Sequence, residues 1–203
     1  AVFLGEDAGR GGVMSLTLLQ EWIDGDDGAF EALYREWHPR LARFAGALLG
    51  SATEGEDVAQ ETFLRLSRSR PQLRARGVGN GRALLYAIAR RLAYTRSAYQ
   101  HRWRSVGAQA EEVKSVLLST AASSPEELFM AAEVGVRIQR AVDELPGPQR
   151  ELILLRHRES LTYDEMAQVL SCSPGQVKAR LHYARKVLRA RLADLGITPE
   201  SLA

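Results

Sequence analysis

Apolar side chains recur every three or four residues along most of the chain between Ser15 and Leu195. The clearest run lies in the first quarter, where the apolar positions are Phe30, Leu33, Tyr34, Trp37, Leu41, Phe44, Ala45 and Leu48. This spacing places them on one face of an α-helix, and no stretch shows the clean alternation of a half-buried strand. The pattern therefore predicts an all-α protein.

Capping and breaking residues mark the helix boundaries in the first half. Ser51 followed three residues later by Glu54 is a capping-box pattern, which predicts the start of a helix. Pro71 is expected to end that helix. Three glycines then predict a loop over residues 71–81. Helical spacing resumes over residues 82–104.

The second half begins with a stretch of different composition. Residues 105–124 lose the helical period and gather Gly, Ser, Thr and Ala, which is typical of a flexible linker. Further helices are predicted over residues 126–145, 149–158, 162–170 and 174–195. The expected plan is two small helical domains, residues 15–104 and 126–203, joined by a flexible linker over residues 105–125. Residues 1–14 are expected to be an N-terminal extension or residues added to the native chain.

Composition limits the class of protein. The 203 residues are 45% hydrophobic and 26% charged, as in an ordinary globular protein. The longest apolar run, residues 83–89, is far shorter than the ~20 residues of a membrane-spanning helix, so no membrane insertion is expected. The single cysteine, Cys172, can form no internal disulfide, and one thiol is too few for a zinc site. We therefore expect a cytoplasmic protein with no cofactor.

Charge is distributed in blocks. Residues 62–110 hold 11 arginines and no acidic residue, and residues 166–193 hold 6 basic residues and no acidic one. Residues 1–61, by contrast, hold 12 acidic residues and 4 basic ones. A bias toward arginine in the genome would explain Arg over Lys, but not the absence of acids. Two separate polyanion-binding surfaces are therefore predicted.

The second domain carries a helix-turn-helix pattern over residues 162–181. Thr162 and Glu165 form a capping box, three residues make the turn, and Pro174 follows Ser173 at the start of the second helix. Val177, Leu181, Ala184 and Leu188 give that helix an apolar stripe. Its other faces carry Gln176, Lys178, Arg180, Arg185, Lys186 and Arg189, which suits base reading by the early residues and phosphate binding by the later ones. The alternative is a solvated basic face.

The first domain carries two further candidate surfaces. Arginines alternate with aromatic residues over residues 82–104, as single-strand binders require, although Tyr86 and Tyr94 could instead be core residues. The preceding helix presents Glu54, Glu56, Asp57, Gln60 and Glu61 with no basic residue among them. That acidic patch suits a basic protein partner or is a solvated face. No carboxylate pair, nucleophile–base set or phosphate loop indicates an enzyme.

Four motifs in register resemble the extracytoplasmic-function (group 4) sigma factors of the sigma-70 family. They are Glu56–Leu66 (EDVAQETFLRL), Ala83–Leu92 (ALLYAIARRL), Leu145–Arg156 (LPGPQRELILLR) and the helix-turn-helix that follows. The resemblance covers residues 18–195. It implies a sigma region 2 domain, a linker and a sigma region 4 domain.

The resemblance also implies functions for particular residues. Core polymerase, through its β′ clamp, would be bound by Asp57, Gln60 and Glu61, and the β subunit would be a further contact. The −10 DNA element would be bound by Asn80, Arg82, Tyr86, Arg90, Arg91 and Tyr94. The −35 element would be bound by Ser173, Gln176, Lys178, Arg180 and Arg185. An anti-sigma factor is the expected regulator.

The sequence departs from the family pattern at two positions. Leu84 stands where family members usually carry Trp, and Tyr183 replaces a basic residue of the recognition helix. Two other functions remain open at this point. One is a helix-turn-helix regulator that acts without core polymerase, and the other is a sigma mimic that binds an anti-sigma factor. The regulator leaves the acidic patch and the Arg/aromatic helix unexplained, and sigma mimics usually carry a receiver domain, for which this sequence shows no pattern.

Overall fold

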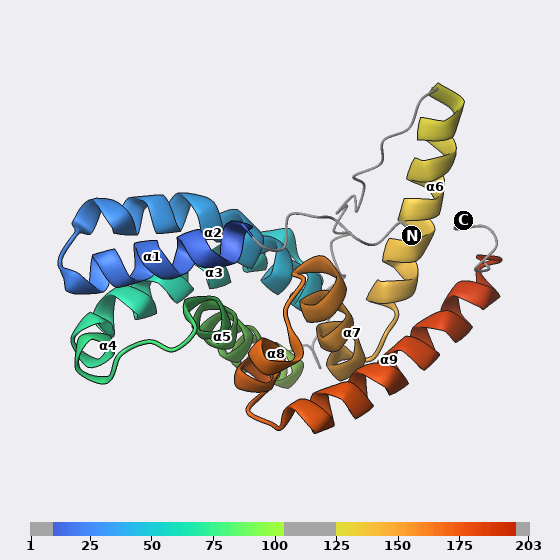
Figure 1. Ribbon diagram of the computed structural model, residues 1–203. Helices are drawn as coiled ribbons and strands as arrows, with labels where there is room; N and C mark the ends of the chain where they lie inside the picture. The colour runs from blue at the N-terminus through green and yellow to red at the C-terminus, as the bar shows by residue number, and fades with distance from the viewer. Residues whose placement is uncertain (1–9, 104–124, 198–203) are drawn as a thin grey trace. The chain divides into compact units, whose positions relative to one another are not determined.

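The computed structural model describes residues 10–103 and 125–197, and all regular structure in these ranges is helical (Figure 1). The helices are α1 (Arg10–Asp24), α2 (Asp27–Leu49), α3 (Ala52–Arg68), α4 (Arg70–Arg76), α5 (Gly81–Trp103), α6 (Pro125–Asp143), α7 (Gly147–Ile153), a π-helical segment (Leu154–Arg158), α8 (Tyr163–Leu170) and α9 (Pro174–Asp194). The all-α prediction is confirmed. None of the described helices is both long and apolar enough to cross a membrane.

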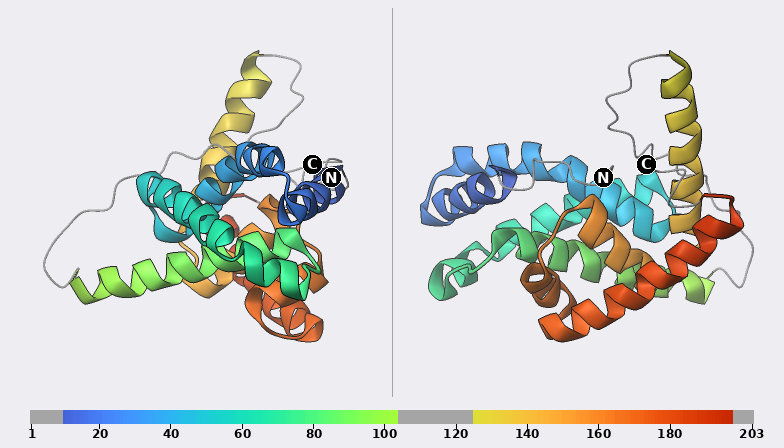
Figure 2. Two further views of the ribbon diagram at one scale, coloured as in Figure 1. Left: turned by 90° about the vertical axis from the view of Figure 1, so that its left-hand side faces the viewer. Right: turned by 45° about the vertical axis from the view of Figure 1, so that its right-hand side comes forward.

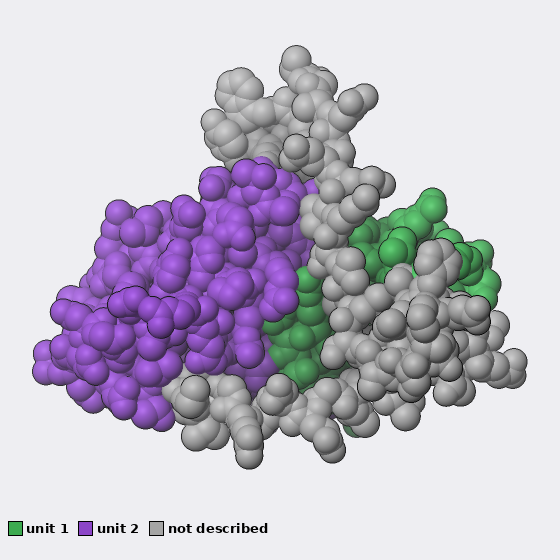
Figure 3. Space-filling model, turned by 90° about the horizontal axis from the view of Figure 1, so that it is seen from above, with its two compact units in different colours: residues 1–4, 114–160, 175–203 green, residues 5–113, 161–174 purple. Residues whose placement is uncertain are grey.

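The chain groups into two compact units, coloured separately in Figure 3. Unit 2 contains α1 to α5 together with residues 161–174, which include α8. Unit 1 contains α6, α7, the π-helical segment and almost all of α9. The sequence did not predict that α8 would group with the first five helices. The predicted linker falls almost entirely outside the described residues, so its flexibility stays a prediction.

Helices α2 and α3 form the most extensive helix pair of unit 2, and Figure 2 shows them running side by side. Gly50 ends α2 in the left-handed conformation (φ 73°), and the Ser51 side chain accepts the Glu54 N–H at the start of α3. Gly55 lies where the helices cross. A Cβ on Gly55 would lie 2.3 Å from the carbonyl oxygen of Ala42 and 2.6 Å from the backbone nitrogen of Gly46. The close crossing therefore requires a residue without a side chain.

Aromatic packing fills the core of unit 2. Trp37, Phe44 and Tyr86 are almost fully buried, and the Tyr86 ring meets the other two edge-on, with centroids 6.0 Å and 5.2 Å away. Leu33, Leu41, Val58, Phe63, Leu66 and Leu85 complete the surrounding apolar layer. The helical stripe predicted from Phe30 to Leu48 supplies much of this core. Because α3 buries Val58, Phe63 and Leu66 in the same core, its opposite side faces outward.

The loop predicted over residues 71–81 is partly wrong. Helix α3 ends at Arg68, and Pro71 lies in the first turn of α4, where its missing N–H would have had no helical partner. Pro71 therefore begins a helix instead of ending one. Only residues 77–80 lie between α4 and α5, and Gly77 has a positive φ (73°), which side-chain-bearing residues rarely adopt.

Unit 1 is built on a run of buried aliphatic residues. Ile153, Leu154 and Leu155 are buried where α7 passes into the π-helical segment, and Ala141, Val142 and Leu145 are buried at the end of α6 and just after it. In α9, Val177, Leu181 and Ala184 are fully buried, as the predicted stripe requires. The exposed faces of α9 therefore lie on the other side of that stripe.

Candidate nucleic-acid interface

The acidic patch lies on the outer face of α3. Val58, Ala59, Thr62, Phe63 and Leu66 turn inward and are buried. Asp57 and Gln60 are exposed, and the Glu61 side chain is about a third exposed. The structure therefore brings the three residues predicted to bind core polymerase onto one accessible helix face.

Surface ion pairs already engage two of these carboxylates. Asp57 Oδ2 lies 3.1 Å from Arg96 Nη2 of α5, and Arg65 Nε donates to Glu61 Oε1 at 2.9 Å. Arg96 Nη1 also donates to the Glu54 carbonyl oxygen. Exposed ion pairs stabilise by only about 0.2 to 1 kcal/mol. Both carboxylates can therefore exchange these partners for cations of another protein at little cost.

The start of α5 places two of the predicted −10 residues beside a carboxylate. Asn80 Oδ1 accepts the Ala83 N–H at 2.9 Å and so caps α5. Its Nδ2 donates to Glu165 Oε1 at 3.3 Å, and Arg82 Nη1 lies 3.9 Å from the same oxygen. Arg82 is 8% exposed. Both residues belong to unit 2, as does α8, which carries Glu165.

Further along α5, the Arg/aromatic pattern divides into inner and outer residues. Arg91 and Tyr94 are exposed, and the guanidinium of Arg90 lies over the Tyr94 ring, 4.9 Å from its centroid. Tyr86, by contrast, has no exposed surface because it packs between Trp37 and Phe44. Its assignment to the −10 surface is wrong for this conformation, and it is a core residue. The side chains of residues 99–104 lie outside the described residues.

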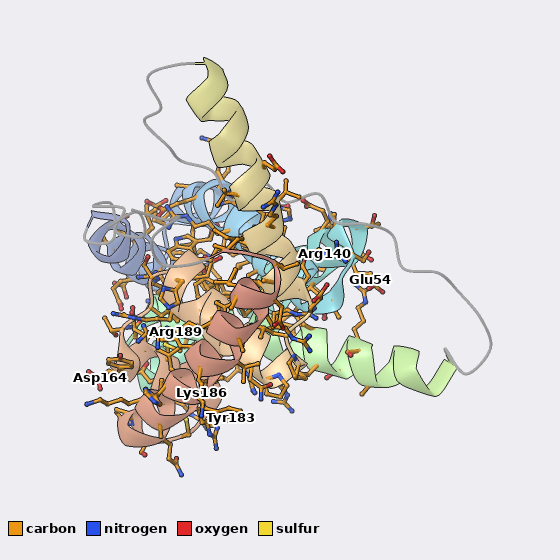
Figure 4. The ribbon with its side chains drawn as sticks, turned by 90° about the vertical axis from the view of Figure 1, so that its right-hand side faces the viewer. Glu54, Arg140, Asp164, Tyr183, Lys186 and Arg189 are labelled. Atoms are coloured by element: carbon orange, nitrogen blue, oxygen red, sulfur yellow. The ribbon has the colours of Figure 1, made fainter. Side chains whose placement is uncertain are left out.

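The helix-turn-helix residues adopt the predicted local structure. Thr162 and Glu165 form both hydrogen bonds of the capping box at the start of α8. Ser171 ends α8 in the left-handed conformation, and α9 begins at Pro174. Ser173, Gln176, Lys178 and Arg180 are exposed. Tyr183, Lys186 and Arg189 follow along α9, exposed to solvent (Figure 4).

Arg185 differs from the other basic residues of α9 because it is half-buried and has a protein partner. Its Nε donates to Nε2 of His157, which lies in the π-helical segment, at 3.2 Å. Burial, and then the nearby charges of Arg185 and Arg156, lower the pKa of His157 to about 4. The imidazole is therefore neutral at physiological pH and accepts this hydrogen bond.

The sequence did not predict three of the residues that contact these candidate site residues. Arg96 pairs with a residue 39 positions away, Glu165 reaches Asn80 over 85 positions, and His157 reaches Arg185 over 28. Only Glu165 carried a signal, and that signal concerned its local role as a helix cap. Within the described ranges, no group of three or more His, Cys, Asp or Glu side chains could hold a metal ion.

Two protein-family models match the chain. The model described as Sigma-70 region 2 matches residues 33–104, which span most of α2 through α5. The model described as Sigma-70, region 4 matches residues 135–188, which reach from α6 into α9. The two matches cover the acidic helix, the Arg/aromatic helix and the helix-turn-helix.

Curated relatives align over most of their length. The chain is 33% identical over 169 residues to the ECF RNA polymerase sigma factor SigL of Mycobacterium tuberculosis (strain ATCC 25618 / H37Rv), covering 82% of this chain and 90% of that protein. It is 26% identical to the ECF RNA polymerase sigma factor SigW of Bacillus subtilis (strain 168), covering 84% and 92%.

Solved structures share the fold. The sigma factor RpoE of Bartonella quintana, in complex with the anti-sigma factor NepR, has a TM-score of 0.62 at 22% identity and covers 81% of this chain and 96% of its own. CnrH, in complex with the cytosolic domain of CnrY, has a TM-score of 0.61 at 24% identity and covers 89% and 98%.

Proposed function

Because this chain belongs to the extracytoplasmic-function sigma factors of RNA polymerase, we propose separate functions for its exposed helix faces. As a sigma factor it binds core RNA polymerase and directs promoter recognition and opening. The observation that carries the assignment is the separation of charge along one chain. The accessible acidic residues Asp57 and Glu61 of α3 precede two basic stretches, residues 62–110 and 166–193, that contain no acidic residue.

The acidic face of α3 is the docking site for core polymerase. Asp57, Gln60 and Glu61 lie together on it, and the ion pairs that Asp57 and Glu61 form with Arg96 and Arg65 are weak surface contacts. A basic clamp surface of the β′ subunit would take the place of those arginines. Complementary charge of this kind mainly speeds association and excludes wrong partners.

The outer face of α5 binds the −10 element. Arg90 and Arg91 provide charge for phosphates, while Tyr94 offers an accessible ring for stacking on an unpaired base. Asn80 and Arg82 contribute from the start of the helix once they leave Glu165. Tyr86 contributes only to the core.

The exposed start of α9 reads the −35 element. Ser173, Gln176, Lys178 and Arg180 lie at or near its N-terminus, the part of a recognition helix that meets base edges in the major groove. Arg185 and Lys186 come later and bind phosphates. We further propose that the protein acts in the cytoplasm without catalysis of its own and that an anti-sigma factor regulates it.

Promoter opening tests this function against a regulator that acts alone. The isolated chain should bind duplex promoter DNA weakly at physiological salt, because each reading module buries only about 600 to 1,000 Å². Core polymerase should fix the spacing of the two modules and yield opened DNA. The measurements are duplex affinity and permanganate reactivity of thymines near the start site, with and without core enzyme. Tight, sequence-specific duplex binding by the chain alone, without polymerase-dependent opening, would favour the regulator.

Two substitutions in α9 should separate base reading from phosphate binding. Arg180→Ala should cost about 1 to 3 kcal/mol of promoter affinity and relax the preference at one −35 position. Lys186→Ala should weaken all promoters alike. Arg140→Ala, at an exposed residue of α6, is the matched control for loss of one positive charge. A promoter library bound by the polymerase complex provides the measurement, and identical shifts for Arg180→Ala and Lys186→Ala would contradict this division.

A further inference from the structure

The π-helical segment Leu154–Arg158 aims a polar side chain at the recognition helix of the same unit. Segments of this kind are rare and occur frequently at functional sites. Leu154 and Leu155 of the segment are buried and hold it in the apolar core. The next residues are Arg156 and His157, and His157 contacts Arg185 of α9.

The hydrogen bond between these two residues fixes the arrangement of both. Nε2 of His157 is the acceptor, so in the neutral ring the proton is on Nδ1. Among the residues that the structure describes, the hydrogen bond to His157 uses the Nε–H of Arg185. The other four N–H donors of a guanidinium are on Nη1 and Nη2, the atoms that meet a phosphate in a bidentate contact.

The chemistry of the acceptor matters as much as its position. A carboxylate at residue 157 would also orient Arg185, but it would cancel the charge that attracts a phosphate. A neutral imidazole orients the guanidinium and leaves its full positive charge in place. The imidazole stays neutral because burial and two neighbouring guanidinium groups, those of Arg185 and Arg156, oppose its protonation.

We infer that His157 is a positioning residue for DNA binding, which holds the Arg185 guanidinium so that Nη1 and Nη2 meet a backbone phosphate of the −35 element. This inference rests on the proposed function of α9 and adds a residue from outside the helix-turn-helix. The ligand of Arg185 is a phosphodiester of duplex DNA. Its contact is independent of sequence, unlike that of Arg180.

Four variants of the full chain test the inference by the salt dependence of −35 duplex binding. His157→Phe removes the acceptor and keeps a ring, whereas His157→Gln keeps an acceptor on a neutral side chain. His157→Glu keeps an acceptor but adds a negative charge, and Arg185→Ala removes the contact itself. Affinity decreases as salt concentration rises, so the slope of log affinity against log salt concentration is negative. Each phosphate contact that is lost makes this slope less steep by about 0.9.

The expected pattern distinguishes a residue that positions Arg185 from one that only stabilises the fold. His157→Phe and Arg185→Ala should each lower affinity several-fold and make the slope less steep by about 0.9. Combining the two should cause no further loss, whereas combining either with Lys186→Ala should. His157→Gln should keep most of the wild-type slope. His157→Glu should bind DNA as poorly as His157→Phe while its melting temperature is unchanged or higher, a combination that a purely structural residue would not give.

Two outcomes would overturn the inference. If His157→Phe is folded by circular dichroism and its slope equals that of wild type, His157 does not position Arg185. If Arg185→Ala leaves the slope unchanged, Arg185 does not bind a phosphate. The second result would also remove Arg185 from the proposed phosphate contacts of α9. Polymerase-dependent promoter opening by the wild-type chain is measured separately, so failure of the inference and failure of the proposed function are distinguishable.

Discussion

Reversing two charges on α3, with Asp57→Arg and Glu61→Arg together, should abolish binding to core RNA polymerase and leave the helical fold intact. Both side chains lie on the solvent side of α3, opposite the buried Val58 and Phe63. Losing their ion pairs to Arg96 and Arg65 costs at most about 1 kcal/mol each. At the interface, two new cations would face a basic clamp, where like charges cost several kcal/mol.

A matched control tests whether the loss of binding is specific to the acidic face of α3. Glu21→Arg with Glu31→Arg changes the net charge by the same amount at exposed positions of two other helices, α1 and α2. The measurements are pull-down of core enzyme and helix content by circular dichroism. The docking assignment would be refuted by undiminished pull-down of the Asp57/Glu61 variant, or by an equal loss in the control.

Adding one methyl group at Gly55 should destabilise unit 2 more than any surface change. A Cβ there would lie 2.3 Å from the Ala42 carbonyl oxygen and within 3 Å of two backbone atoms of Gly46. Backbone cannot rotate away as a side chain can, so α2 and α3 must separate. Because the clash is with backbone atoms, we expect the upper end of the usual overpacking cost, about 3 kcal/mol, from which alanine's better helix propensity regains about 1 kcal/mol. We expect a net loss of about 2 kcal/mol.

Thermal melting measures the effect. A loss of about 2 kcal/mol corresponds to a decrease in Tm of about 10 °C for a unit of this size. Gly147→Ala is the control, because a Cβ at that helical glycine would meet no atom within 4 Å. Its Tm should stay close to that of wild type. If the Gly55→Ala variant has the same Tm as the wild type, α2 and α3 do not cross as closely as described.

The sequence predicted the elements well where the signal was local. Helical spacing, the capping box at Thr162 and the start of α9 at Pro174 each depend on residues within one turn of each other. The error at Pro71 was also local, since a proline both ends helices and begins them. Composition alone does not distinguish the two cases.

The candidate site was predictable only in part, because its contacts join distant segments. Tyr86 and Tyr94 carry the same signal in an Arg-rich helix, yet Tyr86 packs against Trp37 and Phe44 of α2 while Tyr94 remains exposed. The side of α5 that faces α2 decides between them, and no local pattern gives that side. The partners of Asp57 and Arg185 could not be predicted for the same reason, because they lie on other segments of the chain.

The distribution of tryptophan gives the protein a built-in spectroscopic probe. All three tryptophans, at positions 22, 37 and 103, precede the described part of unit 1. Trp22 and Trp37 are buried among the first helices, so intrinsic fluorescence follows the melting of unit 2. Circular dichroism follows every helix. Melting curves from the two methods coincide if the whole chain unfolds in one cooperative transition and separate if each unit unfolds by itself.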